Sequence, residues 1–149
     1  MNDVALAMRL HHGAVIVADL DASIDWYRSI LGFEVERRFE IPGQHTEVAM
    51  LKHGDLRVEL FDARGSKPAH PDRRDPNSDF RTQGNLHFAF AVADVKAVAA
   101  ILRERGAEIV WVRDFDFGSN AFIRDNAGNL IEFVEQKDRL DFRTRSTEE

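Results

Sequence analysis

An internal repeat is the strongest constraint that this sequence places on its fold. Aligned at an offset of 75 residues, His12 falls on His87, and Val-Ala-Asp at 17–19 falls on Val-Ala-Asp at 92–94 without a gap. Such self-similarity indicates one supersecondary unit used twice, with a core shared between neighbouring units. Because the chain has 149 residues, a length that suits one core better than two independent domains, we expect both units to form one domain.

The first half follows the order strand, helix and three strands. Apolar residues recur at three- and four-residue spacing between Leu20 and Leu31, which predicts a helix with one buried face. Asp19 or Asp21 can cap the start of this helix, and Gly32 suits the left-handed position just past its end. The strands are predicted at about residues 11–17, 33–40, 46–52 and 56–62.

The second half repeats this order. A helix is predicted at about residues 95–105, capped by Asp94 and closed by Gly106. Its strands are predicted at about residues 86–92, 108–113, 118–124 and 129–135. The predicted fold class is therefore α+β, with two βαβββ modules in tandem. We expect one domain over residues 9–136, made of module one (9–62), a linker (63–84) and module two (85–136), followed by a polar tail (137–149).

Each module carries a histidine near its start and a glutamate in its last strand. Glu59 and Glu132 correspond at an offset of 73, and strand alternation turns each away from its apolar neighbours. If the two sheets lie side by side, equivalent strands line a common concave surface, where His12, His87 and both glutamates meet. Taken singly, each of the four is more often a surface or hydrogen-bonded residue. The repeated set of two imidazoles and two carboxylates instead favours a divalent Fe, Co, Ni, Zn or Mn ion.

Other histidines are weaker candidates. His11 lies beside His12 and is expected to face the opposite side of the strand, in a structural role. His45 lies on a predicted loop that could reach the site. His53 and His70 belong to a turn and to the linker, where solvent exposure is expected.

Composition excludes several classes of function. The chain has no cysteine, so disulfides, thiolate metal ligands and Cys nucleophiles are absent. A formal net charge of −6 argues against nucleic acid or an anionic membrane as the main partner. No apolar run approaches the ~20 residues of a membrane span, and the first ten residues lack the pattern of a signal peptide. The default expectation is a cytoplasmic protein.

The segments "HHGAVIVADLDASIDWYRSILGFEV", "LRVELFD", "LHFAFAVADV" and "IRDNAGNLIEFVE" together resemble the vicinal oxygen chelate (VOC) superfamily. This superfamily includes glyoxalase I (lactoylglutathione lyase), methylmalonyl-CoA epimerase, extradiol dioxygenases and bleomycin-resistance proteins. The resemblance covers about residues 9–136 and implies the glyoxalase/bleomycin resistance/dihydroxybiphenyl dioxygenase-like fold. It also implies a homodimer and one divalent metal ion per site that chelates two adjacent oxygens of a small-molecule substrate.

Position by position, the resemblance places metal ligands on His12, Glu59, His87 and Glu132. The His-Glu-His-Glu set is most similar to that of glyoxalase I. Related epimerases tend to carry Gln where Glu59 stands, extradiol dioxygenases lack an equivalent of Glu59, and metal-free bleomycin binders usually lack the whole set.

The implied function is that of a metal-dependent lyase or isomerase that transfers a proton next to a carbonyl through a metal-bound enediolate. Glu59 or Glu132 would act as the general base. The alternatives are an Fe(II)-dependent extradiol-type dioxygenase and a binding or resistance protein without turnover.

The substrate pocket is predicted from a few further positions. Arg37 falls where glutathione-dependent members carry an anchoring Arg, whereas Ala63 stands where those members carry an Asn contact, so the resemblance supports glutathione at only one of the two positions. Arg37, His45, Phe61 and Phe122 are the candidate substrate-binding residues. The expected pocket walls are Phe39, Phe61, Phe88, Phe117 and Phe122.

Overall fold

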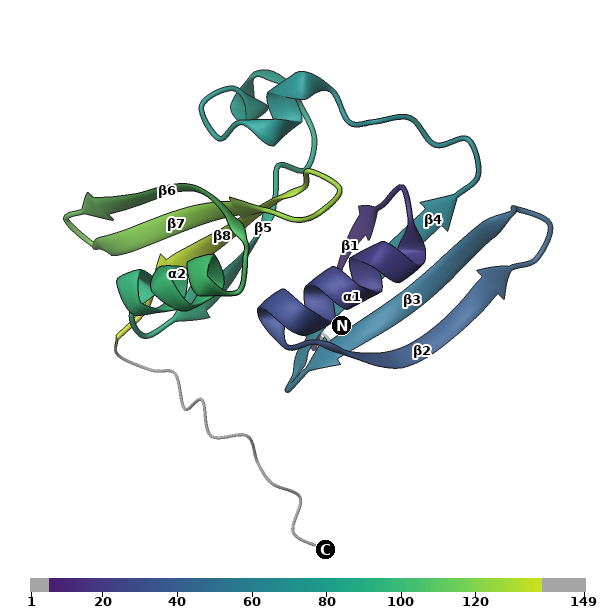
Figure 1. Cartoon of the computed structure of the whole chain (residues 1–149), viewed down its shortest axis with the longest axis horizontal. Helices are drawn as coiled ribbons and strands as arrows, with labels where there is room; N and C mark the ends of the chain where they lie inside the picture. Colours follow the sequence, from purple (N-terminus) through teal and green to yellow (C-terminus); the bar gives the residue numbers. More distant parts are fainter. Residues whose placement is uncertain (1–5, 138–149) are drawn as a thin grey trace, which may run out of the picture.

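The computed structural model describes residues 6–137, which form two four-stranded sheets, each with one helix (Figure 1). Module one consists of β1 (Gly13–Ile16), α1 (Leu20–Leu31), β2 (Glu34–Ile41), β3 (Thr46–His53) and β4 (Leu56–Ala63). Module two consists of β5 (Phe88–Val92), α2 (Val95–Glu104), β6 (Glu108–Phe115), β7 (Gly118–Arg124) and β8 (Leu130–Glu135). The strand orders are β1-β4-β3-β2 and β5-β8-β7-β6, and in each sheet the first strand runs parallel to the last. The predicted tandem βαβββ fold is confirmed.

The helix boundaries follow the predicted capping residues. Asp19, and not Asp21, is the N-cap of α1. Its carboxylate accepts a hydrogen bond from the backbone N–H of Ala22 at 3.0 Å. Gly32 ends α1 with a φ of 77°, a left-handed conformation that a side chain would strain. Asp94 caps α2 in the same way as Asp19 caps α1.

Strand β1 is shorter than predicted, because its ladder with β4 joins only Gly13–Ile16 to Val58–Phe61. His12 therefore lies just before the strand. Among the described residues no helix is long and apolar enough to cross a membrane. Of the predicted polar tail, only Lys137 lies within the described residues.

The predicted linker is a folded segment. We call residues 64–84 the cap. It contains two short 3-10 helices, Pro71–Arg74 and Asp79–Arg81. The guanidinium of Arg73 donates to three cap carbonyl oxygens, those of Asp79, Thr82 and Gln83, at 2.9–3.1 Å. Arg124 of β7 also donates to the carbonyl of Arg74 at 2.6 Å, so the cap is tied both to itself and to module two.

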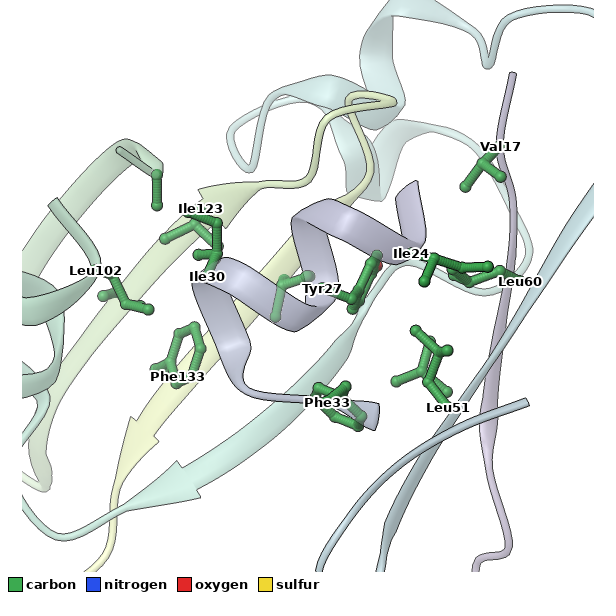
Figure 2. Packing of buried hydrophobic residues seen from close by; sticks show 14 of the residues in the cluster. Val17, Ile24, Tyr27, Ile30, Phe33, Leu51, Leu60, Leu102, Ile123 and Phe133 are labelled. Carbon is green, nitrogen blue, oxygen red and sulfur yellow. The ribbon is translucent and has the colours of Figure 1, made fainter. Parts of the chain in front are cut away.

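One hydrophobic core joins the modules, with α1 between the two sheets (Figure 2). Tyr27 on α1 is fully buried, and its hydroxyl donates to Asp125 in the β7–β8 turn at 2.9 Å. The first strands also approach each other, since a Cβ atom added at Gly13 would lie 3.2 Å from the ring of Phe88. The helix-facing sides of both sheets are thus buried against each other and against α1.

Candidate metal centre

Module one contributes the pair formed by His12 and Glu59. Glu59 lies in β4 opposite Ala14 of β1 and Met50 of β3. As predicted, Val58 and Leu60 on either side of Glu59 point into the core. Alternation along the chain carries His12, two residues before Ala14, to the face of Glu59, and His12 Nε2 lies 3.3 Å from Glu59 Oε2.

Module two contributes the equivalent pair formed by His87 and Glu132. His87 Nε2 lies 2.9 Å from Glu132 Oε2. Phe122, which is opposite Glu132 in the ladder, packs edge-on against the imidazole with ring centroids 4.9 Å apart. The amide of Asn120 donates to Glu132 Oε1 at 3.1 Å. The buried carboxylate of Asp79, in the cap, lies 3.3 Å from His87 Nδ1.

Asp79 and Asn120 are not among the residues predicted from the sequence. Asp79 belongs to a non-repeated, polar segment, where no periodicity assigns a face to any side chain. Asn120 occupies the ladder position that Val48 holds in module one, so the repeat conceals its role. One signal was available in the sequence. Asn120 comes two residues before Phe122 in the strand next to Glu132, so both side chains face the side of Glu132.

The sequence alone leaves open whether the four predicted ligands come from one chain or two, and within the described residues of one chain the two His–Glu pairs do not meet. Among residues 6–137 no three His, Asp or Glu side chains converge on a single point. The physical reason is the position of the shared core. Gly13 and Phe88 approach each other there, so His12 and His87, the residues just before them, are expected to point away from that contact.

Three of the predicted substrate-binding residues lie near the two His–Glu pairs. Arg37 lies in the same ladder row as Met50 and Glu59, with its guanidinium 5.1 Å from the ring centroid of Phe39. Phe61 follows Glu59 by two residues and shares its face. Phe122 contacts His87, as described above.

Other predicted residues lie elsewhere. His45 occupies a turn with a φ of 48° and borders a small depression with Asp62 and Arg64, away from Glu59 along the ladder. Phe88 packs on the helix side, next to Phe90. Phe117 is 79% exposed at the β6–β7 turn. Phe88 lies on the opposite face of β5 from His87, although both residues border a hollow next to Gly13, so its role as a pocket wall stays a prediction.

The donor chemistry of each pair fits a divalent cation. An imidazole nitrogen and a carboxylate oxygen already lie within 3.3 Å of each other in both modules. Two such pairs together supply the mixed nitrogen and oxygen ligands that suit Zn, Ni, Co, Fe or Mn. Each module therefore carries one candidate pair of metal ligands.

The chain belongs to the Glyoxalase/Bleomycin resistance protein/Dioxygenase superfamily, whose family model matches residues 9–133. A 2-epi-5-epi-valiolone epimerase from Actinomyces sp. is 32% identical over 65% of this chain, which spans 58% of that epimerase. A probable lactoylglutathione lyase from Synechocystis sp. is 26% identical over 90% of this chain and all of the lyase. The crystal structure of a glyoxalase family protein from Enterococcus faecalis has a TM-score of 0.71 at 30% identity, covering 85% of this chain and 97% of that one.

Proposed function

We propose that this protein is a divalent-metal-dependent lyase or isomerase that transfers a proton next to a carbonyl group of a small molecule with two adjacent oxygens. The single observation that carries the proposal is the duplicated His–Glu pair, with His12 and Glu59 in one module and His87 and Glu132 in the other. Relatives named as a lactoylglutathione lyase and an epimerase support the reaction class.

We further propose that each complete centre forms between two copies of the chain. The His12–Glu59 face of one copy would meet the partner's His87–Glu132 face, and two-fold symmetry would create a second, identical centre. Exposed apolar side chains support this pairing, because Ile16 (59% exposed) and Phe39 (38% exposed) lie in the ladder row of Phe61, on the face of Glu59.

In such a centre His12 and His87 would hold the cation through their Nε2 atoms, together with Glu59 and Glu132. When bound, the cation supplies Lewis-acid stabilisation of negative charge that develops on the substrate oxygens. Glu132 is the better candidate for the general base, since Asn120 fixes its Oε1 and leaves Oε2 facing the site. Glu132 would accept the proton from the carbon next to the carbonyl and return it to the neighbouring carbon or to the opposite face.

The mixing of two inactive variants tests both the metal centre and its assembly from two chains. His12→Ala and His87→Ala should each lose bound metal while staying folded, because both side chains lie outside the shared core. In a mixed dimer, one centre combines both substitutions and the other has neither. Random exchange of subunits should therefore restore metal to roughly a quarter of all centres, by the symmetry of a two-fold dimer.

Elemental analysis and a chelator control complete this experiment. Wild-type protein should bind about one divalent ion per chain, as two centres per dimer require, and should lose it to EDTA. Absence of metal in the wild type would overturn the proposed function. Metal-binding wild type without recovery in the mixture would instead place all four ligands in one chain. Oxygen uptake with catechols under Fe(II) would favour the dioxygenase alternative.

A further inference from the structure

We infer that Asp79 is a positioning residue for His87, holding Nδ1 of the imidazole so that Nε2 is presented to the cation. This inference rests on the proposed function, because it concerns how one of the proposed ligands is oriented. Asp79 comes from the cap and not from either repeated module, so the repeat assigns it no counterpart.

The contacts of His87 define the two roles. Glu132 lies at Nε2, at 2.9 Å, and Asp79 lies at Nδ1, at 3.3 Å. The two ring nitrogens point in different directions, so the carboxylate of Asp79 approaches from behind the site. A carboxylate accepting from Nδ1–H leaves the Nε2 lone pair free for a metal ion, which fixes both the tautomer and the ring orientation.

The burial of Asp79 is not explained by any other side-chain contact. The residue is 3% exposed, and among the described residues its carboxylate has His87 as its one hydrogen-bond partner. Burying a carboxylate opposes folding unless it is paired, so the position of Asp79 is best explained by its contact with His87.

The cap is built to hold this carboxylate in place. Arg73 donates to the backbone carbonyl of Asp79 at 3.1 Å and to two carbonyls farther along the cap. Arg124 anchors the first 3-10 helix to β7, the strand next to Glu132. The cap that carries Asp79 is therefore fixed to module two, the module that carries His87.

Within residues 6–137, no carboxylate contacts Nδ1 of His12, the histidine of module one. His12 Nδ1 lies 2.7 Å from Nδ1 of the neighbouring His11, and the His12 side chain is 35% exposed, compared with 18% for His87. His12 can therefore serve as a comparison for His87. A substitution at Asp79 should change the His87 half of the proposed centre and leave the His12 half unchanged.

A metal-affinity titration of the full chain tests the inference. We expect Asp79→Ala to weaken Zn²⁺ binding about 10- to 100-fold, the usual effect of losing a partner of a metal-bound histidine, measured by competition with a chromophoric chelator. Asp79→Asn keeps an acceptor oxygen and should recover part of the affinity. Asp72→Ala, which removes a half-buried cap carboxylate paired with His70, is the matched control and should bind Zn²⁺ as the wild type does.

A measurement on the unmodified protein covers the case in which Asp79→Ala does not fold. Long-range ¹⁵N–¹H NMR correlations of histidine in the Zn²⁺-loaded wild type should show His87 protonated at Nδ1. Metal bound at Nδ1 of His87, unchanged affinity in folded Asp79→Ala, or an equal loss in Asp72→Ala would overturn the role of Asp79. Failure of the wild type to bind Zn²⁺ would overturn the proposed function and this inference with it.

Discussion

The two halves of the proposed centre occupy equivalent positions in the repeated modules but differ in how they are supported. Asn120 contacts Glu132, and Asp79 contacts His87. Among the described residues, the Glu59 carboxylate has one polar side-chain partner, His12. The His87–Glu132 half is therefore preorganised by its own chain. Glu59 lies in the internal strand β4, but His12 lies just before the short edge strand β1, so we expect the geometry of this half to depend more on the proposed partner copy.

The largest expected effect distinguishes the two glutamates. We expect Glu132→Gln to lower the rate of proton transfer about 10²- to 10⁴-fold, the usual contribution of a general base, and Glu59→Gln to lower it less. Deuterium incorporation from D₂O next to the carbonyl, with lactoylglutathione and 2-epi-5-epi-valiolone as probes, measures this step. Metal content measured on the same samples separates loss of the base from loss of the ion. A larger effect of Glu59→Gln at full metal occupancy would assign the base to module one.

A smaller effect is expected where the modules meet. The hydroxyl of Tyr27 in α1 donates to Asp125 of module two. The equivalent position in α2, at the offset of 75, is Leu102, which has no hydroxyl. We expect Tyr27→Phe to lower the free energy of unfolding by about 2 kcal/mol, because a hydrogen bond to a buried carboxylate is lost. Zn²⁺ affinity should not change, since Tyr27 lies on the helix side of the sheets.

Ser23→Ala is the matched control for this substitution. Its hydroxyl donates to the neutral side chain of Asn126 at 3.0 Å, in the same β7–β8 turn, and its loss should cost about 1 kcal/mol. Urea unfolding of the three proteins gives the ranking. Equal stability of Tyr27→Phe and wild type would show that the contact between α1 and Asp125 contributes nothing to joining the modules.

The last expected effect appears only at alkaline pH. Burial, followed by the charge of Asp125 and the hydrogen bond to it, raises the pKa of Tyr27 well above its usual value of 10.0. Below pH 10 the phenol is protonated in both states, and above it the unfolded chain loses the proton first. Stability should therefore fall above pH 10 by up to about 1.4 kcal/mol per pH unit.

Tyrosine absorbance makes this effect specific, because Tyr27 is the only tyrosine in the chain. Its ionisation, followed near 295 nm against pH, should coincide with unfolding. Ionisation of Tyr27 near pH 10 in the folded protein would contradict the raised pKa. In Tyr27→Phe the steepest part of the alkaline decline should disappear.

The sequence was sufficient for the fold because the repeat aligned His12 with His87 and its glycine and aspartate positions marked both helices. Strand alternation also gave the correct faces for Glu59 and Glu132, since a period of two allows only two orientations. The same rule separates Phe88 from His87 and Glu132, because neighbouring positions of β5 face opposite sides. Asp79 was not predicted, because its position depends on contacts between the cap and residues far along the chain, such as Arg124.

The sequence by itself determined two βαβββ modules, with one imidazole and one carboxylate on the same face of each. It did so because helix and strand periods and capping residues act over only a few neighbouring positions. The tertiary structure decided that α1 lies between the sheets (Figure 2) and that, among the described residues, the two pairs do not come together. That choice depends on the packing of two helix-facing surfaces, with Tyr27 against Asp125 and Gly13 against Phe88, and no local pattern in the chain encodes which surfaces meet.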